Sequence, residues 1–95
     1  MVIGVNKITF RLAECHSLKE KRKIVKSMIA RVQNNFNSSI AEVALNDVHQ
    51  RAEIGIALVG NDRRTINSKL DKLIEFIENL QLAEIINSDM EIITI

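Results

Sequence analysis

Apolar and polar residues alternate at the start of the chain. Every second residue from Ile8 to Leu12 is apolar, and the residues between them are polar. A period of two is typical of a β-strand with one buried face, so we predict a strand over Val2 to Leu12. Ala13 to His16 would then connect this strand to the next element.

The stretch from Ser17 to Phe36 has apolar residues at the spacing of an amphipathic helix. Its start has the pattern of a capping box, in which the Ser17 hydroxyl accepts from the Glu20 amide and the Glu20 side chain reaches back. The asparagines at positions 34, 35 and 37 favour an end to the helix there. The apolar stripe consists of Leu18, Val25, Met28, Ile29, Val32 and Phe36.

The middle of the chain predicts two strands joined by a hairpin. Ser39 to Val48 is the second strand and Ala52 to Val59 the third, because apolar residues recur at every second position. The polar run Asp47 to Arg51 suits a hairpin, although neither Gly nor Pro marks it. We expect the core side to carry Ala41, Val43 and Leu45 from the second strand and Ile54, Ile56 and Leu58 from the third.

A second helix and a last strand complete the pattern. Gly60-Asn61-Asp62 ends the third strand and supplies an N-cap, Asn61 or Asp62. Apolar residues then recur at helical spacing from Ile66 to Leu80. The last strand falls between Glu84 and Ile95, most clearly over Met90 to Ile95, and Glu84–Ile86 could join it.

The element order β-α-β-β-α-β predicts an α+β fold, the ferredoxin-like split βαβ sandwich, formed by residues 1–95 as a single domain. Right-handed crossovers place two helices on one face of a four-stranded antiparallel sheet with strand order 4-1-3-2. The uncovered face would meet water or pack on another subunit. Its expected residues are Lys7, Thr9, Arg11, Glu42, Ala44, Glu53, Gly55, Ala57, Glu91, Ile93 and Ile95.

Composition narrows the class of protein. The single cysteine, Cys15, excludes an intrachain disulfide and fits a reducing compartment. No apolar run approaches the ~20 residues that a membrane span needs. The first twelve residues also lack the order of a signal peptide, in which charged residues precede an apolar run. We therefore expect a cytoplasmic protein without a membrane partner.

Charge is unevenly distributed along the chain. Residues 1–50 carry a net charge of +4 and residues 51–95 a net charge of −3. Within the predicted first helix, four cations at positions i, i+3, i+4 and i+7 fall on one side of the apolar stripe. These four residues, named here the basic flank, are Lys19, Arg22, Lys23 and Lys26, with Lys21 nearby.

The basic flank and Lys21 are the candidate nucleic-acid-binding residues. Cations along two helical turns could follow a phosphate backbone, with affinity that falls as salt rises. The alternative is a solvated helix face whose long side chains cover apolar surface. The chain has no Tyr or Trp and three Phe, of which Phe10 and Phe36 suit the core, so base stacking on the sheet is not expected.

Other candidate sites are weaker. Asp47, Gln50 and Arg51 could form a ligand-binding patch in the hairpin, or could stabilise the turn and attach it to a neighbouring element. Cys15-His16 together with Asp47 and His49 has ligand chemistry suitable for a metal, but the spacing matches no zinc pattern. A nucleophilic role for the Cys15 thiol would need a general base, and the sequence identifies none. We therefore predict no metal site, no catalytic residues and no cofactor.

Several runs resemble the YlxP-like family, small bacterial proteins classed as a domain of unknown function. These runs are Ser17-Leu18-Lys19-x-Lys21-Arg22, Phe36-Asn37, Ala41-Glu42-Val43, Asp47-x-x-Gln50-Arg51-Ala52, Ile54-Gly55, Ala57 and Asn61-Asp62. The resemblance implies a ferredoxin-like fold that is commonly dimeric. Because family members are often encoded beside translation and ribosome-maturation factors, it also hints at RNA. It brings no established catalytic residues.

Two functions from different classes therefore remain. The first is a non-enzymatic RNA- or ribosome-associated factor, a homodimer, that contacts phosphate through the basic flank. The second is a homo-oligomeric regulatory or small-molecule-binding module that uses the uncovered sheet face or a subunit interface.

Overall fold

The computed structural model describes residues 1–95 and has the predicted element order. Neighbouring strands are antiparallel, and the sheet order β2-β3-β1-β4 is the predicted order read from the opposite edge. The order of elements, the antiparallel sheet and the strand order are therefore confirmed. The elements are β1 (Val2–Arg11), α1 (Leu18–Asn35), β2 (Ser39–Ala44), β3 (Arg51–Gly60), α2 (Arg63–Leu80) and β4 (Glu84–Thr94).

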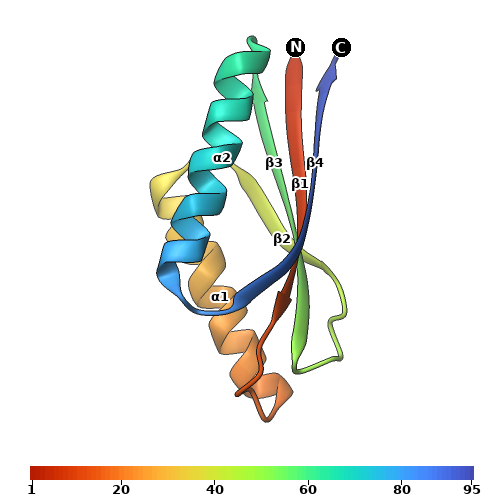
Figure 1. Cartoon of the computed structure of the whole chain (residues 1–95), viewed down its shortest axis with the longest axis vertical. Helices are drawn as coiled ribbons and strands as arrows, with labels where there is room; N and C mark the ends of the chain where they lie inside the picture. Colours follow the sequence, from red (N-terminus) through yellow and green to blue (C-terminus); the bar gives the residue numbers. More distant parts are fainter.

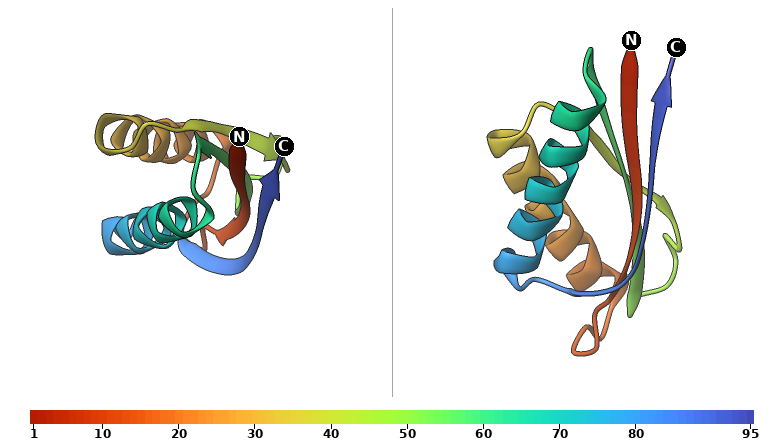
Figure 2. Two further views of the ribbon diagram at one scale, coloured as in Figure 1. Left: turned by 90° about the horizontal axis from the view of Figure 1, so that it is seen from above. Right: turned by 45° about the horizontal axis from the view of Figure 1, so that its top comes forward.

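Both helices lie on the same side of the sheet (Figures 1 and 2). Helix α1 packs over the β2 side of the sheet, whereas α2 packs over β1, β3 and β4. The opposite face, named here the open face, has no helix against it. Neither helix is long and apolar enough to cross a membrane.

The two ends of the sheet differ in what they carry. The chain termini lie side by side at one end, where the Met1 amino group donates to the Ile95 carbonyl at 2.7 Å (Figure 1). The β1–α1 loop and the β2–β3 loop lie at the other end. A backbone hydrogen bond connects these two loops, in which the Leu12 amide donates to the Gln50 carbonyl at 2.9 Å.

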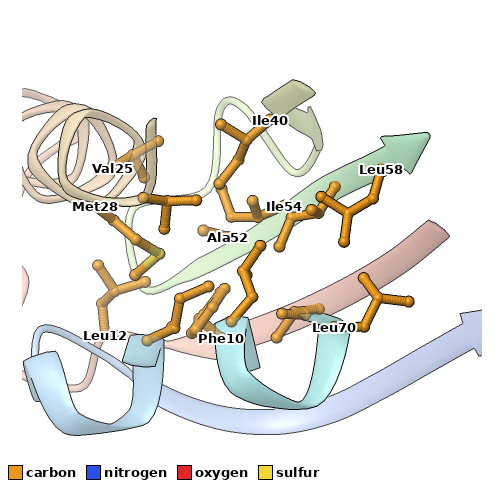
Figure 3. Packing of buried hydrophobic residues seen from close by; sticks show 14 of the residues in the cluster. Phe10, Leu12, Val25, Met28, Ile40, Ala52, Ile54, Leu58 and Leu70 are labelled. Atoms are coloured by element: carbon orange, nitrogen blue, oxygen red, sulfur yellow. The ribbon is translucent and has the colours of Figure 1, made fainter. Parts of the chain in front are cut away.

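The core fills the layer between the sheet and the two helices. Ile8 and Phe10 of β1 are fully buried in it, as their alternation predicts. Figure 3 shows Phe10 in the layer with Ile54 of β3, Met28 of α1 and Leu70 of α2. Gly4 allows α2 to approach β1 closely, since a Cβ atom at this position would lie 2.9 Å from Leu70 Cδ1 and closer still to Ile66. Burial of this apolar surface is the main stabilising term of the fold.

The predicted orientation of β2 is wrong. Ile40 is buried, and Glu42 pairs with the buried Ile54 and faces the helices, whereas Ala41 and Val43 lie exposed on the open face. A shift of one residue in a strand exchanges its two faces, so one misassigned position reverses the whole strand. Val43 has no partner in β3 and forms a bulge between Glu42 and Ala44. Because of this bulge, Ala44 pairs with Glu53 on the open face, where the sequence pattern also placed it.

Two element boundaries also differ from the sequence pattern. Strand β2 ends at Ala44 instead of Val48, and residues 45–50 form the loop to β3. Strand β4 is continuous over Glu84–Thr94, so Glu84–Ile86 does belong to the last strand. The register of β1 and β4 shifts once, between Thr9 and Phe10.

Candidate nucleic-acid interface

Helix α1 begins at a capped N-terminus. Ser17 has an extended backbone, and its hydroxyl accepts from the Glu20 amide at 3.1 Å. The Glu20 carboxylate accepts from the His16 amide at 2.9 Å, one residue before the cap. These two bonds satisfy amides that have no partner within the helix, and they fix where the helical turns of the basic flank begin.

All four side chains of the basic flank are exposed, and none of them forms an ion pair. The only acidic residue on α1 is Glu20, whose carboxylate is engaged at the cap. The positive charge of the flank is therefore not neutralised by a neighbouring side chain, and it produces a local positive potential at the surface.

The basic flank lies on the side of α1 away from α2. Lys26 is two residues from Ile24, about 160° away on a helix, and Ile24 lines a hollow together with Glu78 of α2. Helix α1 packs over β2, which is an edge strand of the sheet, so the flank lies on the β2 side of the molecule. Figure 2 shows the two helices side by side over the sheet. From Lys19 to Lys26 the helix rises by about 10 Å, which spans two or three phosphates of a nucleic-acid strand.

The hollow beside α2 has the opposite charge. It measures about 550 Å³ and lies between the β1–α1 loop, the start of α1 and the end of α2. Four glutamates line it, whereas its one cation, Arg11, forms an ion pair with Glu84 at 3.0 Å. Helix α1 therefore separates a basic surface from an acidic one, and an anionic partner would approach from the basic side. The lining glutamates are Glu14, Glu20, Glu78 and Glu84.

Lys21 does not belong to this exposed surface, so its prediction as a nucleic-acid contact is wrong. Its side chain is fully buried, and its ammonium lies 2.8 Å from Glu42 Oε2. The ammonium also donates to three backbone carbonyls of the β2–β3 connection. On a helical wheel Lys21 falls within the apolar stripe, between Met28 and Val32 and 100° from Arg22, so its spacing is that of a core-facing residue. The wheel cannot show that β2 offers a carboxylate to that position.

The hairpin candidates do not converge on one site. Gln50 donates through Nε2 to the Cys15 carbonyl at 3.5 Å, so it attaches the β2–β3 loop to the β1–α1 loop. Asp47 is exposed and has no side-chain partner. Arg51 pairs with Arg11 across β1 and β3, on the face opposite the helices. Of the three, only Gln50 makes the kind of contact that the structural interpretation expects.

Cys15 is buried, and its thiol donates to the Ser17 carbonyl at 3.3 Å, while His16 is exposed. The two loops that carry Cys15-His16 and Asp47–His49 lie side by side. No group of three or more His, Cys, Asp or Glu side chains gathers there in a way that could hold a metal ion.

A groove on the open face is the feature that sequence reasoning missed. It has a volume of about 560 Å³ and crosses all four strands. Its floor includes Val43 and Gly55, and a Cβ atom at Gly55 would lie 2.8 Å from Val43 Cγ1. Glycine at this position therefore leaves room for the exposed valine, which the sequence assigned to the other face of β2.

The comparisons with known proteins agree on the family. The family model described as "Protein of unknown function (DUF503)" matches residues 3–90. The "Uncharacterized protein YlxP" of Bacillus subtilis (strain 168) is 37% identical over 78 residues, which cover 82% of this chain and 85% of that protein. The resemblance to the YlxP-like family is therefore confirmed, and the family carries no assigned activity.

Solved structures share the fold at low identity. A designed protein with ferredoxin fold, LFR1, is 16% identical with a TM-score of 0.53, covering 98% of this chain and 83% of that chain. The designed protein Foldit4 is 17% identical with a TM-score of 0.50, covering 96% and 93%. SnoaB, a cofactor-independent oxygenase from Streptomyces nogalater, is 15% identical with a TM-score of 0.50, covering 99% and 92%. At these identities the likeness concerns the fold alone.

Proposed function

The chain belongs to the DUF503 family, and from that premise we propose that it is a non-enzymatic, cytoplasmic factor that contacts RNA or a ribonucleoprotein through the basic flank. The observation that carries this proposal is the set of four exposed cations on α1, none of which has an acidic partner. Salt-dependent contact with phosphates is the binding mode that such a surface favours.

The distribution of aromatic residues argues for phosphate contact and against base stacking. Phe10 is fully buried, and Phe36 and Phe76 pack edge to face, with ring centroids 5.4 Å apart. No aromatic ring is therefore available on the open face, where an RNA-recognition sheet would present one. We infer recognition of the shape and backbone of RNA rather than of its bases.

The test measures binding of the purified protein to total RNA and to small ribosomal subunits at about 50 mM and 200 mM salt. Contact with two or three phosphates predicts that log affinity falls against log salt with a slope of about −2. Replacing Lys19, Arg22, Lys23 and Lys26 by Glu should abolish binding without loss of the fold, as judged by circular dichroism.

A matched control changes the net charge equally at another place. Arg31, Arg64, Lys69 and Lys72 are also exposed and form no ion pairs, so their replacement by Glu alters the charge by the same amount. This control should keep a larger share of the binding than the basic-flank variant. Equal losses in both variants would show that only total charge matters, and absence of binding at low salt would refute the proposal.

A second candidate function is favoured by the groove on the open face. We propose that a second copy of the chain or a small molecule covers the open face. Beyond the groove this face also carries apolar residues, because Ile3 pairs with Ile93 of β4 and with the exposed Val59 of β3. In a homodimer built on this face, Ile93→Glu would produce monomers. Val48→Glu serves as the control, since Val48 is comparably exposed but lies in the β2–β3 loop. An unchanged mass in solution for Ile93→Glu would exclude this interface.

A further inference from the structure

The N-terminal turns of α1 are attached to the body of the molecule in an unusual way. Val25, Met28 and Val32 bury the later turns against the core, but Lys21 is the only fully buried side chain before them. Leu18 is only partly buried. Among the fully buried side chains, Lys21 alone attaches the part of the helix that carries Lys19, Arg22 and Lys23, and the partly buried Ile24 adds an apolar contact with the core.

Four oxygen atoms surround this ammonium and form what we name the Lys21 cage. Nζ lies 2.7 Å from the Leu45 carbonyl oxygen, 3.2 Å from that of Asn46 and 3.3 Å from that of Arg51. Glu42 Oε2 is the fourth oxygen, at 2.8 Å, and forms an ion pair with Nζ but accepts no hydrogen bond. The cage thus takes one atom from β2, two from the β2–β3 loop and one from the start of β3.

The backbone of the loop is arranged for this ammonium. Leu45 has a φ of 62°, in the left-handed region that residues with a Cβ atom rarely adopt. Its carbonyl makes the shortest of the three backbone contacts to Nζ. An unfavourable backbone conformation persists only where the surroundings compensate for it, and the charge-assisted hydrogen bond from Lys21 is the compensation available here.

We infer that Lys21 is a positioning residue whose ammonium acts as an internal cation, holding the first turns of α1 and residues 45–50 together as one unit. Without the ammonium, the Glu42 carboxylate and three carbonyls would lose a buried partner, so both segments would open together. A cage emptied by truncation of the side chain would accept a free primary alkylammonium ion of the same length.

Amide hydrogen exchange of the protein alone tests the inference directly. In Lys21→Ala, exchange in the first two turns of α1 and in residues 45–51 should rise about tenfold or more, while the amides of α2 change less. Lys23→Ala is the matched control, since it removes the same charge from the exposed face of the same helix. Unchanged exchange around the cage in Lys21→Ala would overturn the inference.

Chemical rescue separates an internal cation from a side chain that merely fills space. Propylammonium reproduces the atoms that Lys21→Ala removes, from Cγ to Nζ. It should restore slow exchange, whereas sodium chloride at the same ionic strength and propanol should not. If Lys21→Ala does not fold, Lys21→Met retains most of the volume and should show the same local increase. Rescue by propanol as effective as rescue by propylammonium would contradict the role of the charge.

A second measurement connects the cage to RNA and rests on the proposed function. Lys21→Met removes no exposed charge, yet it should weaken RNA binding by loosening the turns that carry Lys19, Arg22 and Lys23. Faster local exchange with unchanged RNA affinity would overturn the positioning role. Because exchange is measured without RNA, failure of RNA binding in the unaltered protein would refute the proposed function alone.

Discussion

The two helices have equal length and cover the same face of the sheet, but different forces attach their first halves. In α2, Ile66 is buried within the first turns and is followed by Leu70, Leu73 and Ile77. In α1, the corresponding first buried side chain is Lys21, and apolar burial begins only at Val25. An apolar stripe needs no specific partner atoms, whereas a buried ammonium requires correctly placed oxygens. The attachment of α1 is therefore more specific and more easily lost through a single change.

The largest expected effect concerns the Lys21–Glu42 pair. Lys21→Ala should lower the free energy of unfolding by about 3–5 kcal/mol, because it leaves a buried carboxylate without its counter-ion. The double variant Lys21→Met with Glu42→Leu should recover most of that loss, since apolar replacements remove both charges. Urea unfolding of the single and double variants measures the coupling. Additive losses would show that the two side chains act independently.

The matching change in α2 is Leu70→Ala, which removes a fully buried side chain. We expect a loss of about 2–5 kcal/mol from the free energy of unfolding, set by the cavity that remains. Propylammonium should restore part of the free energy of unfolding that Lys21→Ala loses, but none of what Leu70→Ala loses. Urea unfolding with and without that ion distinguishes the two kinds of attachment, and an equal response in both variants would contradict the difference.

A smaller effect is expected where α2 approaches β1. Gly4→Ala would place a Cβ atom against Ile66 and Leu70, so the helix must move outward or the side chains must change rotamer. Overpacking of this kind costs about 1–3 kcal/mol. Thermal unfolding should show a lower midpoint for Gly4→Ala. A midpoint equal to that of the unaltered protein would mean that α2 can shift at no cost.

The smallest expected effect depends on pH and concerns the start of α2. The Thr65 hydroxyl and the Thr65 amide both donate to the Asp62 carboxylate and hold its pKa below the usual range. Because the folded pKa is the lower one, the stabilisation is complete at neutral pH. It is lost as the pH falls from the ordinary pKa of aspartate through the lowered one. Asp62→Asn, which does not titrate, should flatten this part of the stability profile. A profile that stays equally steep would assign the acid sensitivity to other groups.

Local sequence signals predicted most of the fold. Ser17 is the N-cap of α1, as predicted, and Asp62, one of the two residues expected, is the N-cap of α2. The alternation in β1 and β3 identified the buried faces correctly. Strand β2 was the exception. Its alternation is compatible with either face, because Ala41 and Val43 are apolar, like Ile40, and flank a glutamate that the sequence alone places in water.

The candidate site was predicted in part. The four cations of the basic flank are exposed, as their helical spacing indicated, but the fifth candidate, Lys21, is buried. A wheel reports direction around one helix and contains no information on what another segment offers to it. The partners of Lys21 lie between 21 and 30 residues away along the chain, beyond the reach of any local pattern.

The sequence by itself determined where the strands and helices lie, how they are capped and which side of α1 is basic. These features depend on residues within a few positions of one another, so a local pattern contains the necessary information. Only the tertiary structure decided which face of β2 is buried, that Lys21 is an internal cation and that Leu45 takes a left-handed backbone. All three follow from the burial of the Lys21 ammonium between segments that are distant in the sequence. A buried ammonium requires oxygen partners, and this requirement outweighs the preference of Glu42 for water and of Leu45 for a negative φ.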